Sequence, residues 1–440
     1  MNKHRSSWLA DIPDHWEIQK LKHIAGVKFS NVDKNTHEDE IPVQLCNYVD
    51  VYANDYITEN MDFMTATATK AEIDMFHLRC DDILVTKDSE SWSDIAVPAL
   101  VKKDYENVLC GYHLAQIRPN PLKIHGEYLL RAFQAHGVNA QFCIASNGIT
   151  RFGLGKYWLD NGLFPVPPLG EQQAIIDYLN RKISEIDAII EKKHQQVRLL
   201  QEKRTAMISH AVTKGIAPKV AMKESGVDWW GKVPKYWQVR KLGYLVSING
   251  GCTPDKSNMQ YWQGQIPWVS PKDMKTRSIV GSTDHVSESA LGETSLKLLQ
   301  PPVVLIVVRG MILAHTFPVG LTTVPVTINQ DMKALRPIAG GNTDYLALLL
   351  EGISGYILSQ VDESAHGTKC LRTEVWKNIE IFIPEVAEQK EICAHLHDKT
   401  RKIEAATEDI QKSIDMLQEY RAAVVSEAII GKATTLNKVE

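Results

Sequence analysis

The chain has 440 residues, of which 44% are hydrophobic and 23% are charged, and its formal net charge at pH 7 is −4. This composition is typical of a globular protein with about two to four structural units, and it excludes a disordered or low-complexity chain. No apolar run reaches the roughly 18 residues of a membrane-spanning helix and the first residues lack a signal-peptide core, so we expect a cytoplasmic protein with no membrane partner.

Cysteine spacing and the distribution of charge further limit the kinds of site and partner that the chain can have. The seven cysteines are scattered and form no CxxC pair, so we expect inert thiols in a reducing compartment and no zinc site. Residues 1–165 hold 22 acidic and 16 basic side chains, whereas residues 214–383 hold 14 acidic and 18 basic ones. A nucleic-acid partner would therefore have to meet local basic faces or a basic partner protein.

Residues 1–165 are expected to form the first of two compact mixed α/β domains. Strand-like runs occur at 81–86 (DDILVT) and 95–101 (IAVPALV), and a helical run follows at 126–137 (GEYLLRAFQAHG). Frequent Gly, Pro and Asn residues cut the strands short. The loops between these elements are where we expect specificity to reside.

Residues 166–215 are predicted to form a first long spacer helix. Apolar side chains recur at spacings of four and three at Leu179, Ile183, Ile186, Ile190, Val197 and Leu200, with Arg204 on the same seam. Prolines precede the start and Gly215 marks the end. The helix should run from about 170 to 213, which is about 65 Å.

Residues 216–383 are predicted to form a second domain that repeats the first. The segment IPDHWEIQKLKHIAGV (12–27) returns as VPKYWQVRKLGYLVSI (233–248), and the Ile-Pro pair at 41 recurs at 266. Strands are expected at 301–308 and 322–328, and a helix at 343–354. The offset between matching positions drifts from 217 to 225, which indicates loops of different length on a shared scaffold.

Residues 384–440 are predicted to form a second long spacer helix and a C-terminal tail. EVAEQKEICAHLHDKTRKIEAAT repeats PLGEQQAIIDYLNRKISEIDAII 217 positions later without a gap, and Arg421 matches Arg204. Its seam contains Leu396, Ile403, Ile410, Ile414 and Leu417. Each seam is incomplete alone, so we expect one antiparallel coiled coil with a globular domain at each end. The alternative is that each helix packs separately on its own domain.

Catalytic motifs are missing from this chain. GGCTPDKS (250–257) has an aspartate where a phosphate loop needs a glycine, and no HExxH or GxSxG pattern occurs. Glu388 and Lys390 have the spacing of some nuclease sites, but they lie in the first turn of the repeated helix. Two diverged copies of one module on a rigid spacer are instead suited to measuring the distance between half-sites on double-stranded DNA.

The chain resembles the specificity subunits of type I restriction-modification systems over essentially its whole length. The resemblance is carried by WLADIPDHWEIQKLKHI and VDWWGKVPKYWQVRKLGYL, by the helix starts FPVPPLGEQQAI and IFIPEVAEQKEI, and by the helix ends EKRTAMISHAVTKG and EYRAAVVSEAIIGK. It implies two target-recognition domains, each reading one half of a split DNA site, joined by helices that set the gap. It also implies a non-catalytic chain that binds no cofactor itself. Two methyltransferase subunits using S-adenosylmethionine and two restriction subunits using ATP and Mg would be its partners.

Candidate DNA-contacting residues are polar or aromatic side chains on loops of both domains. In the first domain they are Lys87, Ser89, Trp92, Asn147, Thr150 and Arg151. In the second domain they are Thr253, Lys256, Asn258, Lys272, Lys275, Arg277, Arg309, His315, Lys369 and Arg372. Arg204 and Arg421 are interpreted as helix-pairing or partner-docking residues. An unrecognised DNA nuclease and a protein-binding coiled-coil scaffold are the alternative functions.

Overall fold

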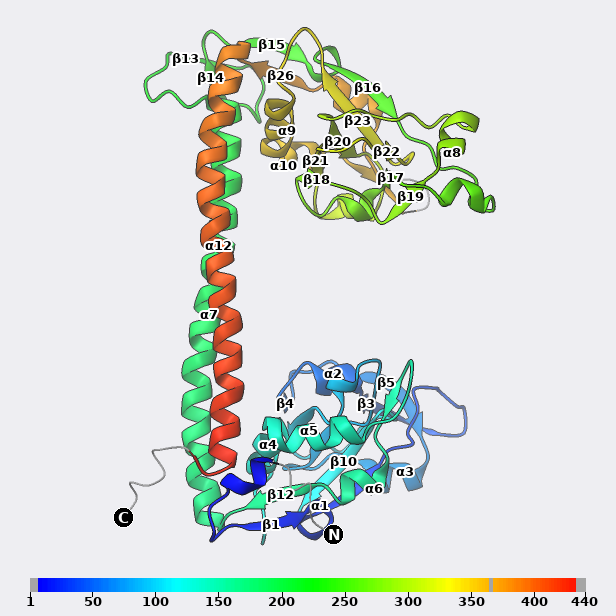
Figure 1. Cartoon of the computed structure of the whole chain (residues 1–440), viewed down its shortest axis with the longest axis vertical. Coiled ribbons are helices and arrows are strands. Elements are labelled where there is room, and N and C mark those ends of the chain that lie inside the picture. Colours follow the sequence, from blue (N-terminus) through cyan, green and yellow to red (C-terminus); the bar gives the residue numbers. More distant parts are fainter. Residues whose placement is uncertain (1–6, 364–366, 433–440) are drawn as a thin grey trace. The chain divides into compact units, whose positions relative to one another are not determined.

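The computed structural model describes residues 7–363 and 367–432, which fall into two compact units (Figure 1). The first unit spans Met1–Lys193 and Gln411–Glu440, and the second spans His194–Ile410. Each unit contains one globular domain and half of each of two long helices, α7 (Leu169–Lys214) and α12 (Val386–Ile429). The predicted mixed α/β fold is confirmed, while residues 433–440 of the expected tail lie outside the described part.

Two sheets and two short strand pairs form the globular domain of the first unit. The five-stranded sheet contains, in spatial order, β2 (Ala25–Phe29), β10 (Leu114–Pro119), β6 (Ile83–Thr86), β8 (Pro98–Val101) and β4 (Tyr56–Ile57). The three-stranded sheet contains β5 (Met64–Ala68), β3 (Ile41–Cys46) and β9 (Val108–Cys110). The pairs are β1 (Glu17–Lys20) with β12 (Leu163–Val166), and β7 (Asp88–Ser89) with β11 (Phe152–Gly153).

Short helices cover these strands. They are η1 (Ser7–Asp11), α1 (Leu21–Ile24), α2 (Tyr48–Tyr52), α3 (Lys70–Phe76), η2 (Trp92–Asp94), α4 (Gly126–Gln134), α5 (His136–Ala145) and α6 (Lys156–Asp160). The expected helix at 126–137 is α4, which places Tyr128, Leu129 and Phe133 in one buried cluster with Ile83 and Ile117 of the large sheet. Burial of these apolar side chains holds the helix on the sheet, each contributing about 1.5–3 kcal/mol.

The globular domain of the second unit is built from the same kinds of sheet. Its five-stranded sheet contains β16 (Val246–Gly250), β23 (Met332–Pro337), β20 (Val304–Val307), β21 (Val319–Thr322) and β18 (Ser278–Ile279). Its three-stranded sheet contains β19 (Asp284–Val286), β17 (Ile266–Val269) and β22 (Thr327–Ile328). The short pairs are β15 (Gln238–Lys241) with β26 (Glu380–Ile383), β13 (Met222–Glu224) with β14 (Lys232–Pro234), and β24 (Asp362–Glu363) with β25 (Lys369–Cys370).

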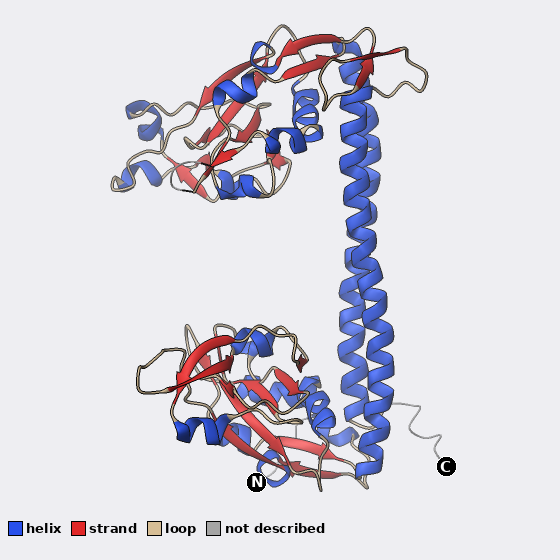
Figure 2. Cartoon of the chain, turned by 180° about the vertical axis from the view of Figure 1, so that it is seen from behind, coloured by secondary structure: helices blue, strands red, loops and turns tan. Residues whose placement is uncertain are grey.

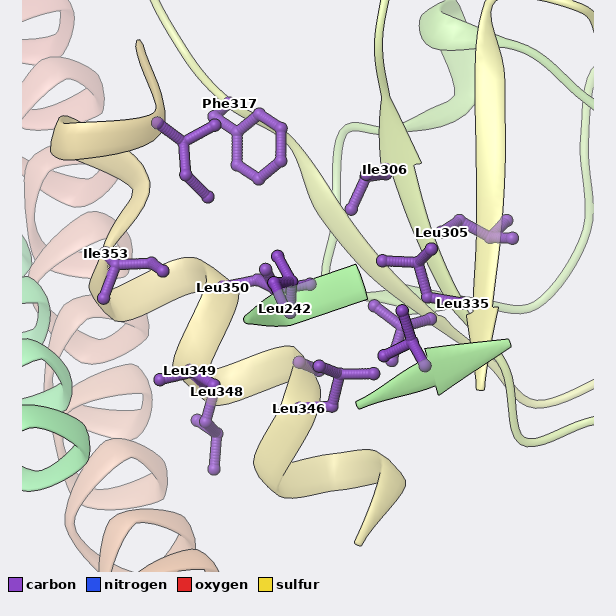
Figure 3. Packing of buried hydrophobic residues seen from close by; sticks show 14 of the residues in the cluster. Leu242, Leu305, Ile306, Phe317, Leu335, Leu346, Leu348, Leu349, Leu350 and Ile353 are labelled. Carbon is purple, nitrogen blue, oxygen red and sulfur yellow. The ribbon is translucent and has the colours of Figure 1, made fainter. Parts of the chain in front are cut away.

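The helices of the second domain surround one large apolar core. They are η3 (Leu242–Tyr244), η4 (Met259–Trp262), η5 (Pro271–Asp273), α8 (Glu288–Glu293), η6 (Met311–Ala314), α9 (Thr343–Gly352), α10 (Ser354–Ser359) and α11 (Thr373–Lys377). Leu346 and Leu350 of α9 lie with Leu305 of β20 and Leu335 of β23 in one cluster of buried side chains (Figure 3). The helix predicted at 343–354 is thus confirmed as α9 followed by the start of α10.

The two domains share one topology, as the repeated sequence predicted. Both five-stranded sheets are antiparallel except for one outer pair, β4 with β8 in the first and β18 with β21 in the second. Both three-stranded sheets combine one antiparallel and one parallel pair. The echoed Ile-Pro pairs occupy equivalent strands, because Ile41 begins β3 and Ile266 begins β17.

The prediction of one continuous strand at 322–328 is wrong, because the structure has two separate strands there. Thr322 ends β21, whereas Thr327 and Ile328 form β22 of the other sheet. Pro325 lies between them and has no N–H to donate to a sheet ladder, which is a physical reason for the break. The other three predicted strands contain β6, β8 and β20.

The long helices pair with each other in both units, and Figures 1 and 2 show the paired segments side by side. In the first unit Leu179 and Ile183 of α7 share a buried cluster with Val424 and Ala428 of α12. In the second unit Ile208, Ala211 and Val212 share one with Ile392 and Leu396. The start of α7 therefore meets the end of α12, and the end of α7 meets the start of α12. This antiparallel pairing excludes helices that pack separately on their own domains.

The repeated tryptophan and the repeated Glu-Gln pair hold each domain to the start of a long helix. Trp16 donates its indole N–H to Glu171 at 2.9 Å, and Trp237 donates to Glu388 at 3.3 Å. In the first unit Gln172 is fully buried, donates to the Pro167 and Lys123 carbonyls at 2.8 and 2.9 Å, and accepts from the His125 N–H at 2.9 Å. The repeat is thus explained by a polar junction that both domains need.

The helix ends complete the same junctions. Gly431 ends α12 with a φ of 77°, and a Cβ there would lie 2.5 Å from the Pro13 ring. Gly215 ends α7 with a φ of 78°, close to Trp237 and Pro234. Both positions need glycine because other residues rarely adopt this left-handed conformation. Among residues 7–363 and 367–432, no helix is both long and apolar enough to cross a membrane.

Candidate nucleic-acid interface

In the first unit, β7 and β11 bring the two candidate loops together. Ser89 pairs with Phe152 and Asp88 with Gly153, and the Leu154 N–H donates to the Lys87 carbonyl at 2.8 Å. The loop at 87–94 follows the central strand β6, and the loop at 147–151 precedes β11. Segments about sixty residues apart in sequence, each selected for its polar side chains, therefore form one surface.

Two of the selected side chains point into the domain. Lys87 is 9% exposed, and its ammonium donates to the Ser30 carbonyl at 3.0 Å and lies 4.6 Å from the centre of the Tyr112 ring. Burial lowers the pKa of this lysine, although nearby Asp88 acts in the opposite direction. Ser89 is also buried, and its hydroxyl lies 3.1 Å from that of Tyr48. Both side chains hold the loop in place.

The other selected residues of this unit are exposed. Trp92 is 56% exposed in η2, and Asn147, Thr150 and Arg151 are exposed on the second loop. The guanidinium of Arg151 lies 3.1 Å from Nδ1 of His113, and the same nitrogen lies 3.3 Å from Asp88 Oδ2. This contact connects the two loops through side chains as well as through the backbone.

An open cavity of about 420 Å³ lies between the two loops and α2. It is lined by Tyr48, Tyr52, Asp88, Ser89, Glu90, Asp94, His113 and Arg151. Tyr48 and Tyr52 are stacked, with ring centres 5.5 Å apart. The cavity thus combines aromatic faces, which can contact sugars and bases, with several hydrogen-bond acceptors.

The second unit brings the equivalent loops together. Arg309 and Cys370 form an isolated antiparallel β-bridge. Beside it, the Gly310 N–H donates to the Lys369 carbonyl at 2.9 Å, and the Leu371 N–H donates to the Val308 carbonyl at 2.8 Å. Because Leu371 matches Leu154 at the 217-residue offset, this is the same local structure as in the first unit. The equivalent of Asp88 is therefore Arg309.

The side chains around this second bridge are mainly cationic. Arg309 and His315 are exposed. Lys369 forms an ion pair with Glu363 at 2.7 Å, and Arg372 pairs with Asp362 at 2.9 Å. These ion pairs lie at the surface, where such contacts contribute little to stability. Lys369 and Arg372 can therefore exchange their carboxylate partners for DNA phosphates.

A further loop of the second unit is organised by Asp273. Its carboxylate accepts hydrogen bonds from the N–H and hydroxyl groups of Ser270 and Thr283, all at 2.9 Å. Burial acts to raise the pKa of Asp273, but these hydrogen bonds outweigh it and hold the pKa below its usual value. The loop presents Lys275, which is exposed, and Lys272, which pairs with Asp284 at 2.7 Å.

The remaining candidates lie at two other places in the second unit. Thr253 bonds to Gln330, Asn258 caps η4, and Lys256 is exposed between them. Arg277 instead points toward α9, where it pairs with Asp344 at 2.5 Å and lies 3.8 Å from Glu351. Arg277 is therefore tied to the junction between the domain and the long helices.

Arg204 and Arg421 occupy equivalent positions in the two junctions. Arg204 pairs with Glu351 at 2.6 Å and lies 3.6 Å from Glu404 of α12. Arg421 pairs with Asp55 at 2.7 Å and with Asp187 of α7 at 3.1 Å. Each arginine thus joins a long helix both to its helical partner and to the globular domain. The apolar seam residues predicted for both helices are all buried or half-buried: Leu179, Ile183, Ile186, Ile190, Val197, Leu200, Leu396, Ile403, Ile410, Ile414 and Leu417.

Six residues that line the first cavity are not among the candidates predicted from the sequence: Tyr48, Tyr52, Asp88, Glu90, Asp94 and His113. Asp88, Glu90 and Asp94 belong to the predicted loop itself, whereas Tyr48 and Tyr52 come from α2 and His113 directly precedes β10. The place of this polar segment directly after a strand indicates a loop but not which of its side chains turn outward. No cluster of three or more His, Cys, Asp or Glu side chains able to hold a metal occurs in the described ranges.

Comparison with known proteins gives consistent matches. The sequence model of the family described as "Type I restriction modification DNA specificity domain" matches residues 13–199 and 234–415. The chain is 29% identical over 201 residues to the type I restriction enzyme EcoR124I/EcoR124II specificity subunit of Escherichia coli, covering 46% of this chain and 47% of that protein. It is also 29% identical over 174 residues to the MjaIX specificity subunit of Methanocaldococcus jannaschii, covering 38% of each.

These alignments thus span about half or less of the length of the relatives. A solved chain from work on "complex assembly and conformational transition of the type I R-M system" matches with a TM-score of 0.63 at 17% identity. That match covers 96% of this chain and 99% of the solved one. At this level of identity the likeness concerns the fold.

Proposed function

Since the chain belongs to the family of type I restriction modification DNA specificity domains, we propose that it is the DNA-reading subunit of a type I restriction-modification complex. Each globular domain reads one half of a bipartite site on double-stranded DNA. The paired helices set the gap between the halves and offer docking surfaces to two methyltransferase subunits.

One observation carries this proposal. The two domains share a topology, yet the equivalent loops after β6 and β20 carry different side chains, with Asp88 in one and Arg309 in the other. A shared scaffold with unlike loops is what reading two different half-sites requires. It also accounts for the polar junctions that hold both domains to the same pair of helices.

The chemistry is assigned to other subunits. Methylation, with S-adenosylmethionine, belongs to the methyltransferase subunits, and cleavage, with ATP and Mg, belongs to two restriction subunits. Glu388, the one carboxylate considered for a nuclease site, accepts hydrogen bonds from Trp237 and from Tyr236 at 2.9 Å. Its place in a structural junction supports a non-catalytic chain.

Methylome sequencing tests the proposal directly. Cells that carry this chain with its methyltransferase subunits should methylate one bipartite motif, and deletion of this chain alone should abolish that methylation. In gel shifts, the chain together with methyltransferase should bind a fragment with the motif tightly, whereas the chain alone should bind weakly. An unchanged methylome after the deletion would contradict the proposal.

A further inference from the structure

The reading surface of the first unit is rich in hydrogen-bond acceptors. Asp88, Glu90 and Asp94 line the cavity, and Arg151 is its single arginine or lysine. Phosphates repel carboxylates, so acidic side chains on a DNA-facing surface are favourable only where a base donates a hydrogen bond to them. In the major groove only the amino groups of cytosine and adenine can do so, and the carboxylate pairing is with N4 of cytosine.

Of these three cavity carboxylates, Glu90 is the one that is available to accept a hydrogen bond from a base. Asp88 Oδ2 lies 3.3 Å from His113, and Asp94 Oδ1 accepts from the Ser93 hydroxyl at 3.1 Å. Glu90 is exposed, and within residues 7–363 and 367–432 its carboxylate has no hydrogen bond or ion pair. A base can therefore donate a hydrogen bond to the Glu90 carboxylate without breaking an existing contact.

The backbone on both sides of Glu90 is held in place. On one side the buried Ser89 hydroxyl accepts from the Ser91 N–H at 3.2 Å. On the other side the Asp94 N–H donates to the Ser91 carbonyl at 3.2 Å. Exposed aromatic side chains lie within the loop and in the cavity lining, with Trp92 56% and Tyr52 47% exposed. A side chain that discriminates between bases needs such a fixed support.

We propose that Glu90 is a specificity-determining residue that accepts a hydrogen bond from N4 of cytosine, so that the half-site read by the first unit contains a C·G pair. The inference rests on the proposed function and names the base chemistry of one half-site. The equivalent loop of the second unit carries Arg309 and is cationic, so the other half-site does not depend on this carboxylate.

The test compares Glu90→Gln and Glu90→Ala with the unchanged chain in the complete methylating complex. Glutamine can form two hydrogen bonds with adenine, so Glu90→Gln should admit A·T at one position of one half-site, while Glu90→Ala should admit any pair there. Discrimination for C·G at that position should fall about 10- to 100-fold in both variants, and the other half-site should not change. Glu106→Gln, exposed and outside the cavity lining, should leave the motif unchanged.

Gel shifts with oligonucleotides substituted at each position separate a reading defect from a folding defect. Loss of affinity confined to the C·G position supports the inference even if methylation in cells is lost. Three results would overturn the inference while leaving a DNA-reading function in place. They are an equal loss of affinity on all sequences, a methylated motif that the Glu90 variants do not alter, and a motif of the unchanged chain that has no C·G pair in either half. If the unchanged chain directs no bipartite methylation, the proposed function itself fails.

Discussion

Individual buried polar residues decide how firmly each domain is attached to the long helices. Gln172 is fully buried, and Gln389, its equivalent, is 3% exposed. Gln389 donates to the Pro384 carbonyl at 3.0 Å and accepts from the Asn342 N–H at 3.1 Å. A buried side-chain amide that makes all these hydrogen bonds stabilises the fold. If the amide is removed, its backbone partners stay buried without a hydrogen bond, which is destabilising.

Replacing Gln172 by leucine should therefore destabilise the first unit strongly. Two carbonyls and one N–H lose their partner, so the free energy of unfolding should fall by about 3 kcal/mol or more. Urea unfolding followed by tryptophan fluorescence measures this change. Gln173, the exposed neighbour, provides the control, because Gln173→Leu should change stability by less than about 0.5 kcal/mol. Equal effects of both variants would contradict the role given to Gln172.

Asp273 gives a pH-dependent prediction at the same scale. Its pKa is lowered in the folded state, so its stabilisation is present above the unfolded value of about 4 and is lost as the pH falls through the folded pKa. Asp273→Asn should lower stability at pH 7 by about 1–2 kcal/mol, because the amide cannot accept all four hydrogen bonds. Urea midpoints of the variant and the unchanged chain should converge as the pH falls below about 4. Asp284→Asn, which loses one surface ion pair, should differ less from the unchanged chain at pH 7.

Among the elements, α7 and α12 depend on packing rather than on intrinsic helix propensity. Half of each helix belongs to each compact unit, where it is covered by the other helix and by the globular domain. Isolated helices are marginal in water, and burial of an amphipathic face is what stabilises them in proteins. The interruptions of the seam by Arg204 and Arg421 are filled by ion pairs with acidic residues of the facing helix and of the domain.

Seam residues and outward residues of α7 should therefore respond differently to truncation. Ile183 is 5% exposed and packs in the core of the first unit, whereas Ile189 is 45% exposed. Ile183→Ala should reduce the free energy of unfolding by about 2–4 kcal/mol, and Ile189→Ala by less than about 1 kcal/mol. Circular dichroism of the helices during urea unfolding distinguishes the two. Similar losses would mean that the helices are held together in another way.

For the whole molecule, the uneven charge predicts how DNA affinity depends on salt. Residues 1–165 carry an excess of acidic side chains, whereas residues 214–383 carry an excess of basic ones. Phosphate neutralisation should therefore come mainly from the second domain and from partner subunits. Each neutralised phosphate contributes about −0.9 to the slope of log K against log salt.

Lys275 tests this distribution of charge. In the complex with methyltransferase, Lys275→Ala should make the salt slope shallower by about 0.9 and weaken binding to cognate and non-cognate DNA equally. Lys235→Ala removes an exposed lysine outside the candidate loops and should leave the slope unchanged. Fluorescence anisotropy across a salt series measures both. A change in sequence preference for Lys275→Ala would instead indicate base contact.

The sequence by itself determined the features that depend on local periodicity and on comparison of the chain with itself. The heptad spacing gave the extent of α7 and the seam shared with α12, and the repeated Trp and Glu-Gln residues gave two equivalent domains. These follow from the sequence because neighbours at spacings of three, four and seven are enough to define a helix face.

Only the tertiary structure decided which side chains of the candidate loops face outward. Lys87 turns inward because Ser30 and Tyr112, which are distant in sequence, surround its ammonium, and Glu90, three residues further on, stays outside. The strand pair β7 and β11 likewise joins loops whose closeness no local pattern reveals. Burial is a property of the neighbours that the folded chain supplies, and for these residues the neighbours come from other parts of the sequence.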